Sequence, residues 1–237
     1  MRLSTSFGLI AAALLLSGCL VSAPPRQQTR VDEIPMYGGL DRAQFPELKS
    51  ADDKFIADVS QAFGSRERAA QLWVNQGYKF YREDNLGMAM RRFNQAWLLN
   101  PGNAEVFAGF AVVLHDQGRN CAAKAMMERA LALDPPTFQG IYADAGRIFT
   151  LCAVQDGNLE AAARERLLAR ADELYARAEQ VEPNKAYVYE SRATACYWRG
   201  QYAEAWAMVA RARAAGGAPG GRFLALLRAK MAEPARP

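Results

Sequence analysis

The chain has 237 residues, 51% hydrophobic and 23% charged, so it is long enough to form one elongated domain or two compact ones. Its 29 Lys and Arg residues barely exceed its 25 Asp and Glu residues and form no long basic block, which argues against a nucleic-acid partner. A single histidine and four cysteines without a Cys-x-x-Cys motif argue against a metal site.

The first residues have the order of a secretion signal. Arg2 precedes an apolar stretch of about ten residues over 7–16, shorter than the about 20 that a transmembrane helix needs, and Leu-Ser-Gly then leads to Cys19. This ending resembles the lipobox of bacterial lipoproteins, which implies a signal peptide over 1–18 and a lipidated Cys19. An ordinary signal peptide cleaved elsewhere is the alternative. Leu20 stands where an inner-membrane retention signal has Asp, so the resemblance implies an outer-membrane anchor facing the periplasm rather than an inner-membrane one.

Residues 19–50 are predicted to be a lipidated and largely unstructured tether, because Pro and Gly recur there and no helical period is visible. Met36 and Tyr37 form an apolar pair suited to docking, but a spacer is the favoured interpretation. Residues 51–69 are predicted to contain a flanking helix that packs on the following array. Its apolar face comprises Phe55, Ile56, Val59 and Phe63.

A pattern of large and small residues then begins and recurs after 34 residues. Large side chains fill the space between two antiparallel helices, small ones permit close approach, and proline stops the second helix. The first occurrence comprises Trp73, Gly77, Phe80, Ala89, Phe93, Ala96 and Pro101. The second comprises Phe107, Ala111, Leu114, Ala123, Met127, Ala130 and Pro135.

The pattern continues twice more with changes. In the third occurrence the two helices are separated by about 14 additional residues, close to four helical turns. We therefore expect a lengthened hairpin with helices near 137–154 and 159–181. The predicted repeats span 70–103, 104–137, 138–185 and 186–217, and a capping helix and tail span 218–237.

This spacing resembles the tetratricopeptide repeat (TPR) family over residues 70–217. The resemblance implies an all-α solenoid, a right-handed superhelix of antiparallel helix pairs in which the first helix of each pair lines a concave surface. It also implies that non-motif residues of the first helices form one partner-binding groove. These residues are Asn75, Tyr78, Tyr81, Arg82, Val112, His115, Tyr142, Phe149, Thr194, Tyr197 and Trp198.

Aromatic residues and Arg are common in interface hot spots, which favours the groove, although Phe149 and Tyr197 fit core positions equally well. The residues with which chaperone-binding TPR proteins hold a carboxylate are absent. The groove is therefore expected to favour apolar or aromatic ligand residues.

Three cysteines lie within the predicted array. Cys121 begins a second helix and Cys152 ends the first helix of the next pair, so the implied fold places both at the same end of antiparallel neighbours. We expect these two to form a disulfide, which an exported protein permits. Cys196 replaces a core residue and is expected to remain a buried thiol.

The chain contains no nucleophile elbow, phosphate loop or zinc motif, and His115 beside Asp116 is better explained as a surface histidine near a helix end. We therefore expect a non-enzymatic scaffold, without cofactor or metal, that binds an envelope protein or peptide during assembly of an outer-membrane, pilus or secretion complex. An accessory subunit of a peptidoglycan enzyme is the alternative, and an enzyme in its own right ranks third. Neither nucleic acid nor a small-molecule substrate is expected.

Overall fold

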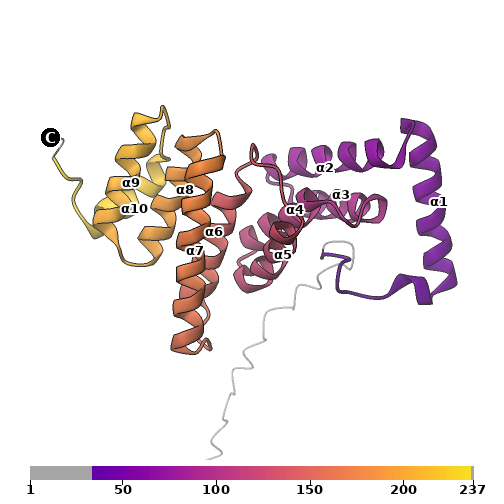
Figure 1. The fold of residues 1–237 in the computed structure, drawn as a ribbon, viewed down its shortest axis with the longest axis horizontal. Coiled ribbons are helices and arrows are strands. Elements are labelled where there is room, and N and C mark those ends of the chain that lie inside the picture. Colours follow the sequence, from indigo (N-terminus) through magenta and orange to yellow (C-terminus); the bar gives the residue numbers. More distant parts are fainter. Residues whose placement is uncertain (1–33, 236–237) are drawn as a thin grey trace, which may run out of the picture.

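The computed structural model describes residues 34–235, so the predicted signal peptide and Cys19 lie outside the described part. Residues 34–235 form ten α-helices and a short 3-10 helix, and no strand (Figure 1). Successive helices pack as antiparallel pairs along the long axis of the molecule. The fold is therefore all-α, as predicted. Within the described range, no helix combines the length and apolar character needed to cross a membrane.

The helices form four pairs with a flanking helix at each end. The pairs are α2 (Arg66–Arg82) with α3 (Leu86–Leu99), α4 (Ala104–Asp116) with α5 (Asn120–Ala132), α6 (Ile141–Gln155) with α7 (Ala161–Val181), and α8 (Lys185–Trp198) with α9 (Tyr202–Ala214). The flanking helices are α1 (Pro46–Phe63) and α10 (Gly221–Lys230).

Side-chain caps explain where several helices begin. The hydroxyl of Ser65 accepts a hydrogen bond of 3.1 Å from the backbone N–H of Arg68 at the start of α2. Amide oxygens cap α3, α4 and α8 in the same way, from Asn85, Asn103 and Asn184. The polar residue before each helix thus satisfies a backbone N–H group that has no partner within the helix.

The first two pairs are joined around Phe93 of α3, which is fully buried. A Cβ atom added to Gly77 of α2 or to Gly109 of α4 would lie 2.6 or 2.4 Å from Cε1 of the Phe93 ring. Only glycine leaves room for the ring at these two positions. The Phe93 ring therefore determines how closely α2, α3 and α4 approach one another.

The predicted tether is wrong over its last part. α1 begins at Pro46 rather than near residue 51, because proline suits the first position of a helix, where its missing N–H is not needed. Residues 34–37 lie against the array instead of forming a spacer. The apolar face of α1 packs on the array as predicted, with Phe55, Ile56 and Val59 against Ala69, Ala70 and Leu99.

The insertion in the third pair lengthens the hairpin, as expected. α7 has 21 residues, whereas α5 has 13, and the α6–α7 hairpin extends beyond its neighbours in Figure 1. Cys121 at the start of α5 is joined to Cys152 near the end of α6 by a disulfide. Cys196 is a free and buried thiol, and its burial raises its pKa to about 11.

The last helix covers the C-terminal end of the stack. It begins at Gly221, within the predicted span of 218–237, and its Leu227 is fully buried. Phe223 and Leu224 pack on the apolar cluster of α8 and α9. The indole N–H of Trp206 donates to the carbonyl oxygen that follows α10, so α9 also holds the end of the cap.

Candidate functional site

A pocket opens beside the C-terminal half of α2. It has a volume of about 350 Å³ and is lined by Asn75, Tyr78, Arg82 and Gln139. The phenol of Tyr78 donates a hydrogen bond of 3.2 Å to the backbone oxygen of Glu105, and the amide of Gln139 donates to the Glu105 carboxylate. Arg82 is exposed, and no residue in the range 34–235 forms an ion pair with it. The pocket therefore contains the positively charged guanidinium of Arg82, without an acidic partner in the described range, beside amide and phenol groups.

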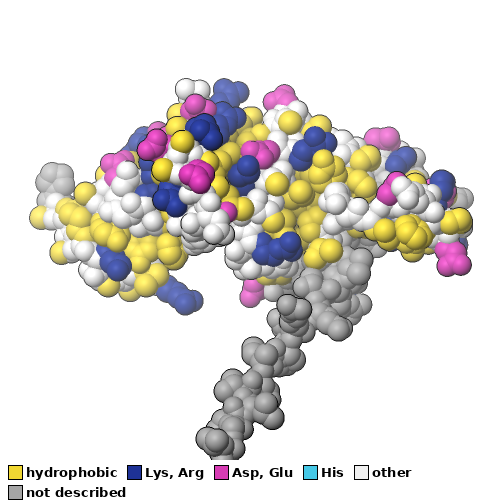
Figure 2. Space-filling model, turned by 90° about the horizontal axis from the view of Figure 1, so that it is seen from below, with side chains coloured by type: hydrophobic (Ala, Val, Ile, Leu, Met, Phe, Trp, Pro, Cys, Tyr) yellow, Lys and Arg dark blue, Asp and Glu magenta, His cyan; other side chains and the backbone are white. Residues whose placement is uncertain are grey.

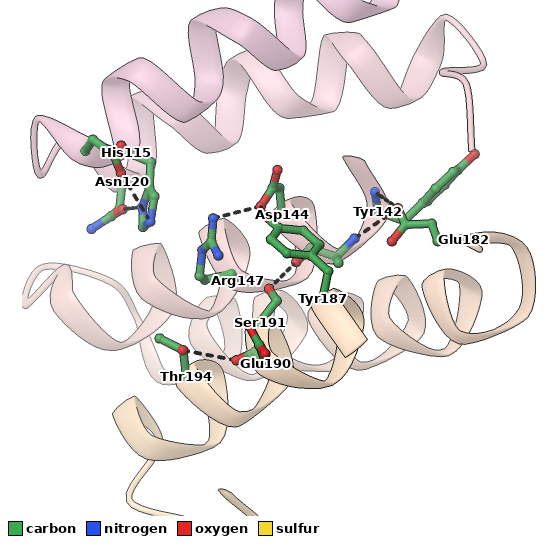
Figure 3. Close-up of polar contacts among 12 residues, drawn as sticks. His115, Asn120, Tyr142, Asp144, Arg147, Glu182, Tyr187, Glu190, Ser191 and Thr194 are labelled. Atoms are coloured by element: carbon green, nitrogen blue, oxygen red, sulfur yellow. Dashed lines mark hydrogen bonds and ion pairs between the residues drawn. The ribbon is translucent and has the colours of Figure 1, made fainter. Parts of the chain in front are cut away.

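A polar cluster lies further along, between α6 and α8 (Figure 3). The guanidinium of Arg147 lies 2.7 Å from Oδ1 of Asp144, and the phenol of Tyr187 donates to the same oxygen. Asp144 is only 8% exposed, so these two donors supply the partners that a buried carboxylate requires. Burial alone would lower the pKa of Arg147, but the Asp144 carboxylate raises it above its ordinary value. Arg147 is therefore charged at all physiological pH values.

Gly140, in the loop before α6, allows the Tyr187 ring of α8 to lie close to that loop. Its φ is +77°, and an added Cβ would lie 2.7 Å from Cε1 of the Tyr187 ring. A residue with a side chain would thus both strain the backbone and displace Tyr187. The loop before α6 therefore places Tyr187 beside Asp144.

The N-terminus of α6 is capped from the end of α7. The Glu182 carboxylate, 1% exposed, accepts hydrogen bonds from the backbone N–H groups of Tyr142 at 2.7 Å and Ala143 at 3.4 Å. Burial raises the pKa of Glu182 to about 7, although the two N–H groups oppose this shift. Because Gly140 has no side chain to cap α6, the distant carboxylate provides the acceptor.

His115 belongs to a structural network. Its Nδ1 lies 2.6 Å from Oδ1 of Asn120, and the Asn120 amide donates to the side-chain oxygen of Gln155 at 2.5 Å. This chain of contacts joins α4, α5 and α6. Burial, and secondarily the positive charge of Arg147, lowers the pKa of His115, which is therefore neutral at pH 7. Its position supports packing rather than proton transfer.

A second, smaller pocket of about 170 Å³ continues from the polar cluster toward the C-terminal cap. It is lined by Arg147, Tyr187, Glu190, Ser191, Thr194, Pro219, Gly220 and Phe223. The negative charge of Asp144 acts on Tyr78 in the first pocket. The pKa of Tyr78 is raised, first by burial and then by Asp144. The first pocket is lined from α2 and Gln139, the second is lined from α6, α8 and the cap, and the first helices α2, α4, α6 and α8 contact one another in sequence.

The structure groups some of the predicted groove residues. Asn75, Tyr78 and Arg82 share the first pocket. Tyr81 is half-buried near Asp116, and burial followed by the Asp116 charge raises its pKa. These residues lie at the α2 end of the face, beside the polar cluster.

Two predicted groove residues belong to the core. Val112 is 3% exposed and Phe149 is 2% exposed, so neither is available to a partner. Both lie on helices in the middle of the stack, which have neighbours on several sides. The groove assignment of these two residues is therefore wrong.

The remaining aromatic residues do not extend the groove. The ring of Tyr142 lies 5.9 Å from the guanidinium carbon of Arg177 in α7, and Figure 3 shows it pointing away from Asp144. Tyr197 packs against Trp198 and Phe223 at ring distances of 5.6 and 6.0 Å, so it belongs with the cap. Trp198 is 49% exposed, but it lies on this aromatic cluster rather than beside Tyr78.

Sequence reasoning missed the most polar part of the face. Gln139, Asp144, Arg147 and Tyr187 were not among the expected residues. Gln139 lines the first pocket, Arg147 and Tyr187 line the second, and the buried Asp144 binds both of the latter. Asp144 and Arg147 are three residues apart on one helix, which is the available sequence signal for their ion pair. On the side seen in Figure 2, acidic and basic side chains are interspersed over α7–α9 and form no large patch of one sign.

Comparisons with models of protein families, with curated proteins and with solved structures find no match for this chain. Among residues 34–235, no group of three or more His, Cys, Asp or Glu side chains is arranged to hold a metal ion.

Proposed function

We propose that this protein is a lipid-anchored scaffold of the TPR type, which binds an extended segment of an envelope protein along the face of α2, α4, α6 and α8. One observation carries the proposal: one pocket is lined from α2 and Gln139, and another is lined by Arg147 and Tyr187 of the Asp144–Arg147–Tyr187 cluster. Amides and phenols suit the polar backbone of an extended segment, and Arg82 suits a carboxylate. The lipobox-like ending at Cys19 supports attachment to the outer membrane on the periplasmic side.

Crosslinking in intact cells, followed by mass spectrometry, tests the binding face. Asn75→Ala combined with Arg82→Ala should remove the crosslinks to the partner while leaving helical content unchanged, because both side chains are exposed. The matched control is Arg170→Ala with Glu173→Ala, which removes an exposed ion pair on α7. Equal crosslinking by the groove and control variants would contradict the proposal. Crosslinks to peptidoglycan synthases or hydrolases would instead favour the accessory-subunit alternative.

Anchoring has its own test. Cys19→Ser should release the protein from the membrane fraction, because acyl chains supply the membrane affinity of a lipoprotein. Mass spectrometry of the parent's mature N-terminus should show a lipidated cysteine. An unmodified N-terminus together with unchanged membrane attachment of the variant would rule out the lipoprotein assignment.

A further inference from the structure

Asn94 of α3 is a buried amide, 3% exposed, on the side of the array formed by the second helices of the pairs. A buried amide is costly unless its donor and acceptor groups are satisfied. Here its Oδ1 accepts a bond of 2.7 Å from the backbone N–H of Met36, and its Nδ2 donates to the backbone oxygen of Ile34 at 2.8 Å. The side chain thus binds the N–H and C=O groups of a bent segment, which continues into a turn closed by a hydrogen bond of 3.1 Å from the Gly39 N–H to the Met36 backbone oxygen.

The residue that follows this segment fills an aromatic socket. The ring of Tyr37 packs edge-on against Phe107 and Trp97 at centroid distances of 4.9 and 6.3 Å. The guanidinium carbon of Arg129 lies 5.1 Å from the Tyr37 centroid. Helices α3, α4 and α5 each contribute one side of the socket. Aromatic pairs and a cation over a ring give this contact a defined geometry as well as apolar burial.

The chain between this contact and α1 is tied to α1, through the Arg42–Asp52 ion pair at 2.6 Å, rather than to the array. Leu40 is 56% exposed and Phe45 is 45% exposed, and Gly38 turns the chain with a φ of +74°. α1 contains no fully buried residue. Residues 34–37 are therefore held mainly by their own contacts with the array, so they are able to open without unfolding it.

We propose that Asn94, Trp97, Phe107 and Arg129 form a slot that binds a short peptide turn carrying an aromatic residue, and that residues 34–37 occupy it reversibly as an intramolecular latch. The slot is separate from the face of α2, α4, α6 and α8, so it does not depend on the function proposed above. Its ligand class is defined by two elements, a bent backbone bound by Asn94 and an aromatic side chain in the socket.

Opening the latch changes the geometry of the N-terminal segment. With the latch closed, residue 34 is held beside α3. With it open, the chain stays held at Arg42, whose guanidinium lies 2.6 Å from the Asp52 carboxylate of α1, and residues 34–41 add a reach of up to about 27 Å at about 3.4 Å per residue. The latch therefore controls both the length and the attachment point of the segment that leads to Cys19.

Fluorescence anisotropy with a labelled peptide tests the slot. The probe has the sequence of residues 32–40, and the proteins are the mature parent and its Tyr37→Ala variant. Tyr37→Ala should vacate the socket and bind the probe saturably, at least tenfold more tightly than the parent, whose own segment competes at high effective concentration. Adding Asn94→Leu should abolish binding while keeping the site packed, and the probe carrying Tyr37→Ala should not bind.

Three results would overturn the proposal: no probe binding to Tyr37→Ala, equal binding to parent and variant, or binding that survives Asn94→Leu. Hydrogen exchange of the parent provides a measurement that needs no variant. The Met36 amide should exchange more slowly than in the free peptide and faster than the amides in the middle of α3. Exchange as fast as in the peptide would show that the latch does not form, and exchange as slow as in α3 would show that it does not open.

Discussion

Phe93 of α3 and Tyr175 of α7 occupy equivalent positions in two helix pairs, and their surroundings differ. Phe93 is packed between Gly77 and Gly109 with no polar atom of its own. Tyr175 approaches Gly146 in the same way, but its hydroxyl donates a hydrogen bond of 3.0 Å to the backbone oxygen of Ser191. We call the contact of α2, α3 and α4 around Phe93 the apolar junction, and the contact of α6, α7 and α8 around Tyr175 the polar junction.

The polar junction contains more than this bond. Asp144, Glu182 and Ser191 are all buried between α6, the end of α7 and α8. The Ser191 hydroxyl donates to the backbone oxygen of Ala143 at 2.9 Å. Buried polar groups are favourable only while their partners remain in place. The apolar junction should therefore respond mainly to changes in side-chain volume, and the polar junction to pH and to single-atom changes.

The largest effect is expected from emptying the apolar junction. Phe93→Ala should lower the free energy of unfolding by about 3–5 kcal/mol, because three helices lose the ring that fills the space between them. Denaturant unfolding measures the loss. Phe138→Ala is the control, since Phe138 is 67% exposed, and it should change stability by about 0.5 kcal/mol or less. A loss no larger than that of the control would contradict the role assigned to Phe93.

The disulfide lies between the two junctions in the stack, because it connects α5 of the second pair to α6 of the third across a sequence separation of 31 residues. Replacing both cysteines, Cys121→Ser with Cys152→Ser, should cost about 3–4 kcal/mol in the chain-entropy treatment of a loop of this size. Thermal unfolding with and without a reductant gives the comparison. The parent should be destabilised by the reductant and the double variant should not. A double variant that responds to the reductant as the parent does would show that the bond is not the source of the effect.

The polar junction is expected to weaken as pH rises. Because folding raises the pKa of Glu182 from 4.5 to about 7, the folded state binds more protons between these values. Stability from this group is therefore complete below pH 4.5 and is lost as pH rises to about 7, by at most about 3 kcal/mol at 1.36 kcal/mol per pKa unit.

Glu182→Gln isolates this contribution, because the variant keeps an oxygen acceptor for Tyr142 and Ala143 but does not ionise. The difference in unfolding free energy between parent and variant should change across pH 4.5–7. The contributions of the other titrating groups are the same in both proteins and cancel in this difference. A difference that is constant over this range would contradict the raised pKa.

The smallest effect concerns the hydroxyl that separates the two junctions. Tyr175→Phe should cost about 1 kcal/mol, the usual net contribution of a hydrogen bond. A double-mutant cycle with Ser191→Ala measures whether the two hydroxyl groups, 3.2 Å apart, are coupled. Strict additivity would show that they act independently.

Much of the helical order was predictable from local signals. The spacing of Phe93 and its equivalents placed the second helices, and Ser and Asn residues capped several helix starts. The first turn of α1 was missed because Phe45 provides no side-chain cap and Pro46 resembles a spacer residue. The latch was missed because its partner Asn94 lies 58 residues from Met36.

The binding face was less predictable because it depends on how each helix is rotated within the stack. The eleven buried residues of α6, out of 15, include Phe149 and the polar Asp144, so burial does not follow hydrophobicity on this helix. Asp144 is tolerated there because Tyr187 approaches from α8, 43 residues later. A contact of this kind has no local signature. The TPR resemblance therefore assigned Tyr142 and Phe149 to the groove without information on these contacts.

The covalent link between α5 and α6 also has a mechanical consequence. If the protein is pulled at its two ends, the segment between Cys121 and Cys152 cannot extend, since the load passes through the sulfur–sulfur bond. The fully stretched oxidised chain is therefore shorter than the reduced chain by about 100 Å, at about 3.3 Å per residue. Helix pairs on either side of the bond can unravel under load while the segment between the two cysteines carries no tension.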